Sequence, residues 1–180
     1  MKKSYRDIVS YVLFIGTTLC YYFSYSTILK LLLNTSIKEV YTHLGKFLLW
    51  ANAFILHSVG FLNFTITEDK IIFLDVNRFI SIGPGCSGFK QSLLIICVMS
   101  VLMISWKRKI LLILNSILIL QLYNLIRIFL LSLIMIYLPD IWKFSHDYVF
   151  RPGYYLVIFY LWEFHGRKNS LGFQKLLALN

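Results

Sequence analysis

Charged residues are scarce in this sequence. They make up 14% of its 180 residues, while hydrophobic residues make up 58%. A soluble domain is nearer one quarter charged and one half apolar. This shortage, together with a mean hydropathy of +0.71, indicates a protein whose solvent is a lipid bilayer. The net charge of +10 falls in short clusters between apolar runs, and no DNA- or RNA-binding module is recognisable, so we expect no nucleic-acid partner.

Several catalytic motifs are also missing. The chain has no H-E-x-x-H zinc motif, no G-x-S-x-G and no paired intramembrane aspartates, which argues against the corresponding intramembrane proteases. We expect neither a metal ion nor a cofactor. Cys20, Cys86 and Cys97 cannot all pair with one another, and two of them lie inside apolar runs, where cysteine usually acts as a small hydrophobe. The basic N-terminus lacks an A-x-A-like cleavage site, which predicts an uncleaved membrane anchor.

Four apolar runs are candidates to cross a bilayer core that needs roughly 20 helical residues. They cover residues 8–33, 89–106, 110–138 and 148–164. Basic clusters lie before the first run, between the second and third, and after the fourth, and such clusters mark the cytoplasmic side. The pattern predicts a multi-pass cell-membrane protein with both termini inside. Residues 34–88 and 139–150 are then expected outside.

Residues 44–64 are also largely apolar. If they crossed the membrane, the basic turn at residues 107–109 would face outside, against the charge rule. We therefore expect an interfacial or re-entrant helix on the outer surface, with a fifth span left open. The β-formers between residues 65 and 74 predict a small outer hairpin, and residues 78–82 predict a further strand. The expected fold is an all-α membrane protein with about four transmembrane helices, this outer helix and the hairpin, in one domain of residues 1–180.

The stretch Gly-Pro-Gly-Cys-Ser-Gly at residues 83–88 is the sharpest local feature. It predicts a turn that brings Cys86 to the start of a membrane helix, where free N–H groups and the helix dipole stabilise a thiolate. Lys90 lies four residues on and would add positive charge on the same helix face. Glycines such as Gly88 would let a substrate backbone approach closely. A helix-start turn with an incidental cysteine explains the segment equally well.

Arg127 is the second candidate. Asn124 and Gln121 precede it at intervals of three residues, so the three form one polar stripe on an apolar helix. An arginine inside the membrane is costly and indicates a functional site, although a structural clamp on backbone carbonyls is the alternative. His146, beside Asp147, is the third candidate because the predicted topology places it at the same membrane level.

Two further histidines, His43 and His57, are also expected outside and compete for the role of His146. His165 follows the last apolar run and is expected on the cytoplasmic side. A loop histidine alone is usually solvated, so the assignment of His146 depends on its being close to the other two candidates.

The order Cys86-Ser87-Gly88, Asn124-x-x-Arg127 and His146-Asp147 before a final helix resembles the exosortase/archaeosortase family over roughly residues 45–165. The resemblance implies that Cys86 is the nucleophile, with Arg127 and His146 as catalytic partners. Ser87, Gly88, Lys90 and Asn124 are expected to support the site or contact the substrate.

The resemblance also implies a function. It predicts a cysteine transpeptidase or protease that processes C-terminal sorting signals of exported proteins, in which a short motif precedes a membrane helix and a basic end. Longer members have more helices, so this chain resembles a short variant, and its substrate signal stays open. The sequence does not decide between an amine acceptor and water. The main alternative is a non-catalytic membrane assembly or transport subunit.

Overall fold

The chain is mostly helical and carries one small antiparallel sheet. The computed structural model describes residues 2–33, 37–67, 70–82, 86–102 and 104–177. Its long helices are α1 (Lys2–Leu33), α2 (Ile37–Ser58), α3 (Phe89–Ser100), α4 (Trp106–Tyr137) and α6 (Arg151–Leu177). Between α4 and α6 lie three short pieces, the 3-10 turn η1 (Pro139–Ile141), α5 (Trp142–Phe144) and the π-helix η2 (Ser145–Phe150). The strands are β1 (Phe64–Ile66), β2 (Lys70–Phe73) and β3 (Arg78–Ser81).

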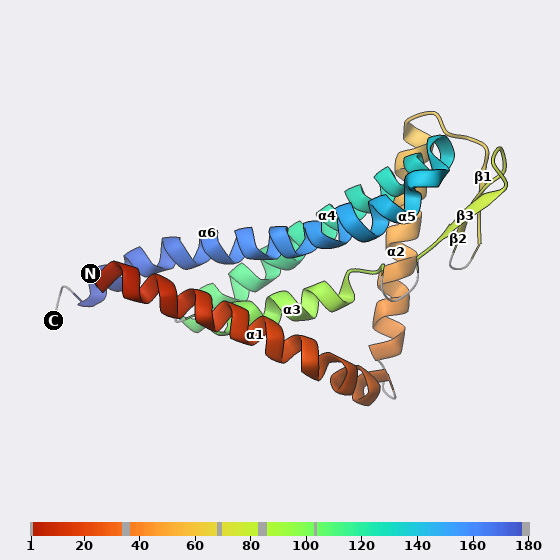
Figure 1. Ribbon diagram of the computed structural model, residues 1–180. Coiled ribbons are helices and arrows are strands. Elements are labelled where there is room, and N and C mark those ends of the chain that lie inside the picture. The colour runs from red at the N-terminus through yellow and green to blue at the C-terminus, as the bar shows by residue number, and fades with distance from the viewer. Residues whose placement is uncertain (1, 34–36, 68–69, 83–85, 103, 178–180) are drawn as a thin grey trace.

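Four helices form an elongated bundle. α3 packs against α1, α4 and α6, and α4 packs against α6. The start of α1, the end of α6, the end of α3 and the start of α4 lie toward one end of this bundle (Figure 1). α2 crosses the opposite end, and the sheet lies beyond it (Figure 1). The elements that the sequence assigned to one side of a membrane are therefore grouped at one end of the molecule.

α3 is shorter than the apolar run that predicted it. It has 12 residues and ends at Ser100, although the run continues to residue 106. The ammonium group of Lys109 donates a hydrogen bond of 2.7 Å to the Ser100 carbonyl, an arrangement that stabilises a helix C-terminus. At about 1.5 Å per residue, α3 is roughly 18 Å long, well short of a core of about 30 Å. The prediction of one helix through residues 89–106 is wrong in this respect.

The number of membrane spans stays a prediction. Within the residues that the structure describes, α4 alone combines sufficient length with a strongly apolar composition, having 32 residues and a most apolar window of mean hydropathy 2.1. At about 1.5 Å per residue α4 is roughly 48 Å long, so a straight, upright helix would protrude from the bilayer.

The three strands form an antiparallel meander in the order β1-β2-β3. Ile71 pairs with Ile80 across β2 and β3, and both side chains are buried. Alternation along β2 also buries Phe73 but leaves the intervening Ile72 partly exposed, as expected of a sheet with one covered face. The structure confirms the predicted hairpin, and the further strand predicted at residues 78–82 is β3. This strand leads through Ile82 toward the Cys86 turn.

α2 covers the buried face of the sheet. Leu48, Leu49 and Leu56 are buried and pack in a cluster with the sheet and with Ile128 of α4. Asn52, also buried, donates a hydrogen bond of 3.0 Å to the hydroxyl of Ser132 on α4. On the other side α2 exposes three aromatic residues, Phe47, Trp50 and Phe54. The helix begins and ends earlier than the predicted range of residues 44–64, and its placement as an interfacial helix remains a prediction.

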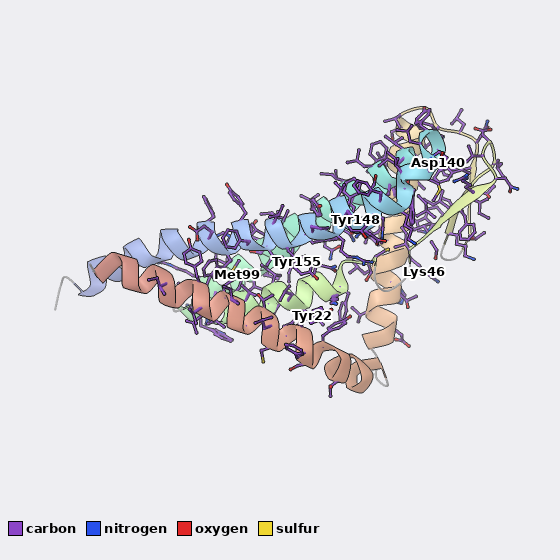
Figure 2. All side chains as sticks on the ribbon, viewed as in Figure 1. Tyr22, Lys46, Met99, Asp140, Tyr148 and Tyr155 are labelled. Carbon is purple, nitrogen blue, oxygen red and sulfur yellow. The ribbon has the colours of Figure 1, made fainter. Side chains whose placement is uncertain are left out.

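α4 joins two apolar clusters. The inner cluster lies within the bundle and includes Leu120 of α4, together with Met99 of α3 (Figure 2). The outer cluster lies between α2, the sheet and α4, and includes Ile128. Asn124 and Arg127 fall between these two positions on α4 and are themselves buried. The polar stripe predicted from the sequence is therefore enclosed where the two clusters meet.

Candidate active site

Cys86 lies in the turn just before α3. The helix begins at Phe89, and its N-cap residue Gly88 has a φ of +73°. The buried hydroxyl of Ser87 accepts the Phe89 N–H at 3.3 Å, which stabilises the helix start. The expected turn thus brings Cys86 to a helix N-terminus, although residues 83–85 lie outside the described residues.

Gly88 fits closely against α4. A Cβ atom at this position would lie 3.0 Å from Asn124 Nδ2, 3.0 Å from Gln121 Nε2 and 3.1 Å from Gln121 Oε1. The sequence predicted that a substrate backbone would approach this glycine closely. In the structure, side chains of α4 make the close approach. Both the positive φ and the contact require glycine here.

Replacing Gly88 with alanine should lower the free energy of unfolding by about 1–2 kcal/mol from the left-handed backbone alone, with a further loss from the contact with α4. The measurement is thermal unfolding of the detergent-solubilised protein. Gly16→Ala is the matched control, because Gly16 lies within α1 and a Cβ there would meet nothing within 4 Å. Equal melting temperatures for Gly88→Ala and the wild type would contradict this account of the turn.

The polar stripe of α4 holds this turn. Asn124 Nδ2 donates to the Cys86 carbonyl oxygen at 2.9 Å, and Arg127 Nη2 donates to the same oxygen at 3.5 Å. Gln121 Nε2 donates to the Ser92 hydroxyl at 3.0 Å, one turn into α3. All three members of the stripe therefore bind the segment around Cys86. The structure brings two of the three predicted catalytic residues, Cys86 and Arg127, together.

Arg127 lies in an apolar environment. Its side chain is on the face of α4 between the two clusters, and the residue is 3% exposed. The guanidinium carbon lies 5.1 Å from the centre of the Tyr154 ring, which provides a cation–π contact. Arg127 Nε is buried and has no hydrogen-bond partner in the described part of the chain. The guanidinium therefore clamps a backbone carbonyl and also keeps a donor for another oxygen.

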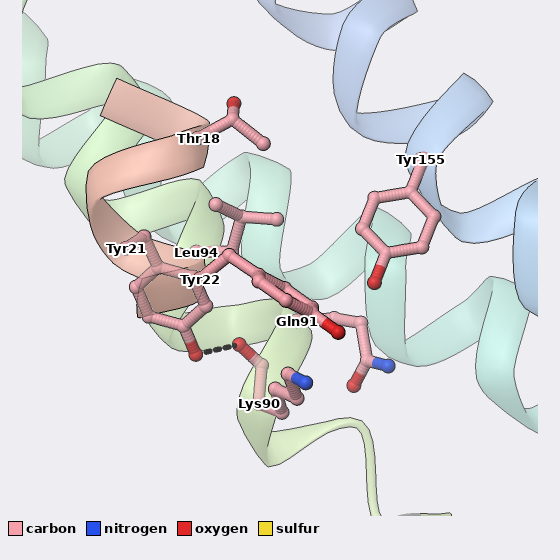
Figure 3. A pocket seen from close by; sticks show the side chains of 7 residues that line it. All are labelled: Thr18, Tyr21, Tyr22, Lys90, Gln91, Leu94 and Tyr155. Atoms are coloured by element: carbon pink, nitrogen blue, oxygen red, sulfur yellow. Dashed lines mark hydrogen bonds between the residues drawn. The ribbon is translucent and has the colours of Figure 1, made fainter. Parts of the chain in front are cut away.

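Lys90 does not take the position expected from the sequence. Because α3 begins only at Phe89, Cys86 and Lys90 are not one helical turn apart on a shared face. The Lys90 ammonium group lies over the ring of Tyr25 at 4.5 Å and that of Tyr22 at 5.3 Å, both on α1. The Tyr21 hydroxyl donates to the Lys90 carbonyl at 2.7 Å, beside a cavity of about 20 Å³ (Figure 3). Lys90 thus joins α3 to α1.

His146 lies in the π-helix η2 and has a carboxylate partner. His146 Nδ1 is 2.9 Å from Asp147 Oδ1, and its ring stacks on Trp142 at 5.2 Å with an angle of 10°. Arg151 Nη2 lies 3.4 Å from the same carboxylate oxygen. The hydrogen bond with His146 and the charge of Arg151 lower the pKa of Asp147, so this carboxylate stays ionised at neutral pH. An ionised Asp147 can accept a hydrogen bond from Nδ1–H, which leaves Nε2 as the unprotonated nitrogen.

The His146 segment packs against α4. The Tyr123 hydroxyl donates to the Phe150 carbonyl at 3.1 Å, which ties the end of η2 to α4 four residues before Arg127. No hydrogen bond or ion pair in the described part of the chain joins His146 to Cys86 or Arg127. The direct convergence of all three residues therefore stays a prediction.

The other histidines differ in position. His43 and His57 are exposed on α2, whereas His165 is buried on α6, beyond Trp162 of the inner cluster. Among the described groups of His, Cys, Asp and Glu side chains, none is arranged to hold a metal ion.

Comparison with known families supplies the remaining observation. A family model described as transmembrane exosortase (Exosortase_EpsH) matches residues 8–162, which is most of the chain. The chain belongs to the exosortase family. No curated protein and no solved structure matches it.

Membership of the exosortase family indicates the general functional class of the protein. It is a family of membrane proteins involved in the processing of sorting signals, and its members are generally cysteine transpeptidases. The matched range spans the positions of Cys86, Arg127 and His146 and of the supporting residues predicted beside them. The sequence-based resemblance to this family is confirmed.

Two features of this exosortase site were not predicted. The sequence places Asp147 beside His146 but does not indicate that the two side chains are hydrogen-bonded. Tyr154 is the second feature, since nothing in the sequence distinguishes it from the other tyrosines of the last apolar run. No sequence pattern indicates that Tyr154 lies beneath an arginine of another helix, because that contact depends on how α4 and α6 pack.

Proposed function

We propose that this exosortase is a membrane-embedded cysteine transpeptidase or protease that processes C-terminal sorting signals of exported proteins by acyl transfer. The observation that carries the proposal is the junction of the Cys86 turn with α4. There Asn124 and Arg127 bind the Cys86 carbonyl, and Arg127 keeps an unpaired donor. A cysteine fixed beside a buried guanidinium suits an acyl-transfer reaction.

The proposed chemistry gives each of these groups one role. The Cys86 thiolate attacks a peptide carbonyl of the sorting motif, and Arg127 stabilises the resulting oxyanion. His146, oriented by Asp147, removes the thiol proton and later delivers a proton to the leaving amine. The acyl group then passes from Cys86 to an amine or to water. For His146 to act directly, the η2 segment has to approach Cys86 when substrate binds, and catalytic contacts often tighten at that step.

The membrane arrangement belongs to the same proposal. Both termini and the basic turn at Lys107–Lys109 would face the cytoplasm, while α2, the sheet and η2 would lie on the outer side. The grouping of these elements at opposite ends of the bundle supports the arrangement (Figure 1). Because α3 is only about 18 Å long, Cys86 would lie below the outer surface of a core about 30 Å thick. A sorting motif next to a substrate's membrane helix can reach that depth.

This topology predicts that reporter domains fused after Lys70 and after Lys109 report opposite sides of the membrane. The two positions lie in β2, which precedes α3 in the sequence, and in the first turn of α4, which follows it. Alkaline phosphatase and a fluorescent protein that folds only in the cytoplasm provide complementary readouts. Reports from the same side for both fusions would contradict the topology and the placement of Cys86.

The proposed activity is tested by co-expression. The probe is an exported protein from the same genome that ends in a short motif, an apolar helix and basic residues. With the wild-type chain present, this protein should lose its C-terminal helix, seen as a smaller product. The same protein with its motif residues changed to alanine is the control and should stay full length. Equal processing with and without the chain would overturn the proposed function.

A further inference from the structure

Tyr154 is a buried residue whose hydroxyl is not satisfied. The residue is 1% exposed, and its hydroxyl oxygen has no hydrogen-bond partner in the part of the chain that the structure describes. The hydroxyls of Tyr21 and Tyr123 each donate to a backbone carbonyl. Leaving a buried hydroxyl unpaired costs roughly 1–3 kcal/mol. Tyr154 therefore differs from these two tyrosines in having a free donor.

The position of this donor is informative. The Tyr154 ring lies beneath the Arg127 guanidinium, at 5.1 Å, and meets the ring of Tyr123 edge to face at 5.0 Å. Arg127 in turn donates to the Cys86 carbonyl oxygen at 3.5 Å. Arg127 of α4 therefore contacts both the Cys86 turn and Tyr154 of α6. Two groups with unused donors, the Arg127 Nε–H and the Tyr154 O–H, belong to the same buried region beside Cys86.

We propose that Tyr154 is a further catalytic residue, whose hydroxyl donates a hydrogen bond to the oxyanion formed when Cys86 attacks the substrate. The inference rests on the proposed acyl-transfer function. In this step a sulfur lone pair forms the C–S bond, and the π electrons of the carbonyl move onto its oxygen. Tyr154 and Arg127 donate hydrogen bonds to that oxygen without giving up their protons. When the carbonyl re-forms, the C–N bond breaks and the amine leaves with a proton from His146.

A phenol and a guanidinium suit this task because the site is buried. Tyr154 packs in the inner cluster with Leu94, Ile95 and Ile158, whose apolar side chains offer no competing hydrogen bonds. Hydrogen bonds to a developing negative charge are stronger in such surroundings than in water. The bond to the oxyanion would also satisfy the hydroxyl that otherwise lacks a partner.

The decisive variant is Tyr154→Phe, which keeps the ring beneath Arg127 and removes only the hydroxyl. Its neighbour gives the matched control, Tyr155→Phe, because Tyr155 is exposed and lies on the wall of the small cavity beside Lys90 (Figure 3). We expect processing of the co-expressed probe to slow about 100- to 1,000-fold in Tyr154→Phe and to stay at the wild-type rate in Tyr155→Phe.

A second readout separates catalysis from packing. Iodoacetamide alkylates Cys86 by displacement of iodide, a reaction that forms no oxyanion. Mass spectrometry of the Cys86 peptide should therefore show wild-type alkylation rates in Tyr154→Phe even though processing is slow. If alkylation falls in proportion to processing, Tyr154 only positions the turn and the inference is overturned.

The remaining outcomes distinguish the two proposals. Wild-type processing by Tyr154→Phe, with Cys86→Ala inactive, would overturn the role of Tyr154 alone. Processing that persists in Cys86→Ala would overturn the acyl-transfer function itself.

Discussion

Replacing Cys86 with alanine should abolish processing of the co-expressed signal while leaving the protein in the membrane at wild-type abundance. The bonds that fix this turn, from Asn124 and Arg127, go to the Cys86 carbonyl oxygen, which alanine retains. The thiol is half-buried, so its removal costs little packing. Loss of a nucleophile that acts in concert with its partners typically lowers the rate by about 10⁴-fold or more. Pulse–chase labelling of the substrate measures the loss.

Cys97→Ala is the matched control for this variant. Cys97 lies on α3, packed against the inner cluster, and no part of the proposed chemistry uses it. It should process the signal at the wild-type rate per molecule. If the two variants are impaired equally and both lose abundance, the cysteines are structural and the assembly or transport alternative is favoured. Wild-type processing by Cys86→Ala would show that the nucleophile is misassigned.

Arg127→Lys should be nearly as damaging despite keeping the charge. The guanidinium makes two contacts, a bond to the Cys86 carbonyl and a cation–π contact with Tyr154, and it keeps a free Nε–H donor. A compact ammonium group cannot reproduce this planar arrangement. Losing one oxyanion donor alone lowers a rate by about 100- to 1,000-fold, and we expect a loss of at least that size. Rates are measured in membranes that contain equal amounts of each variant.

Arg108→Lys provides the comparison for Arg127→Lys. Arg108 is an exposed residue in the first turn of the same helix, at the end away from Cys86, and should tolerate lysine. Near-normal processing by Arg127→Lys would contradict the oxyanion role. A variant that disappears from the membrane would instead show that Arg127 acts chiefly as a structural clamp, the alternative that its bond to a backbone carbonyl also supports.

The polar stripe of α4 shows what the sequence was able to predict. Gln121, Asn124 and Arg127 recur every three residues, and this period alone places them on one helix face. In a helical bundle the polar face of an apolar helix points inward. Here that face forms hydrogen bonds with the Cys86 turn. The strands were predictable for a similar reason, since β-formers alternate with turn residues between residues 64 and 82.

The errors arose where tertiary contacts decided local structure. The apolar run after Cys86 gave no sign that Lys109 would cap α3 at Ser100, because that bond joins two helices across a turn. Lys90 was placed beside Cys86 on the assumption that the helix included the cysteine. The left-handed Gly88 delays the helix to Phe89, and Lys90 then faces the tyrosines of α1. The contact between Tyr154 and Arg127 also depends on how two helices pack, which no local pattern encodes.

The most direct test of the account is to look for the acyl group on Cys86. Membranes that contain the wild-type chain and its substrate are quenched with acid during processing, and the Cys86 peptide is analysed by mass spectrometry. The account predicts a thioester-linked fragment of the substrate on Cys86, released by hydroxylamine and absent when the substrate's motif is altered. Accumulation of processed substrate while Cys86 stays unmodified and the acyl group is carried by another residue would contradict the account.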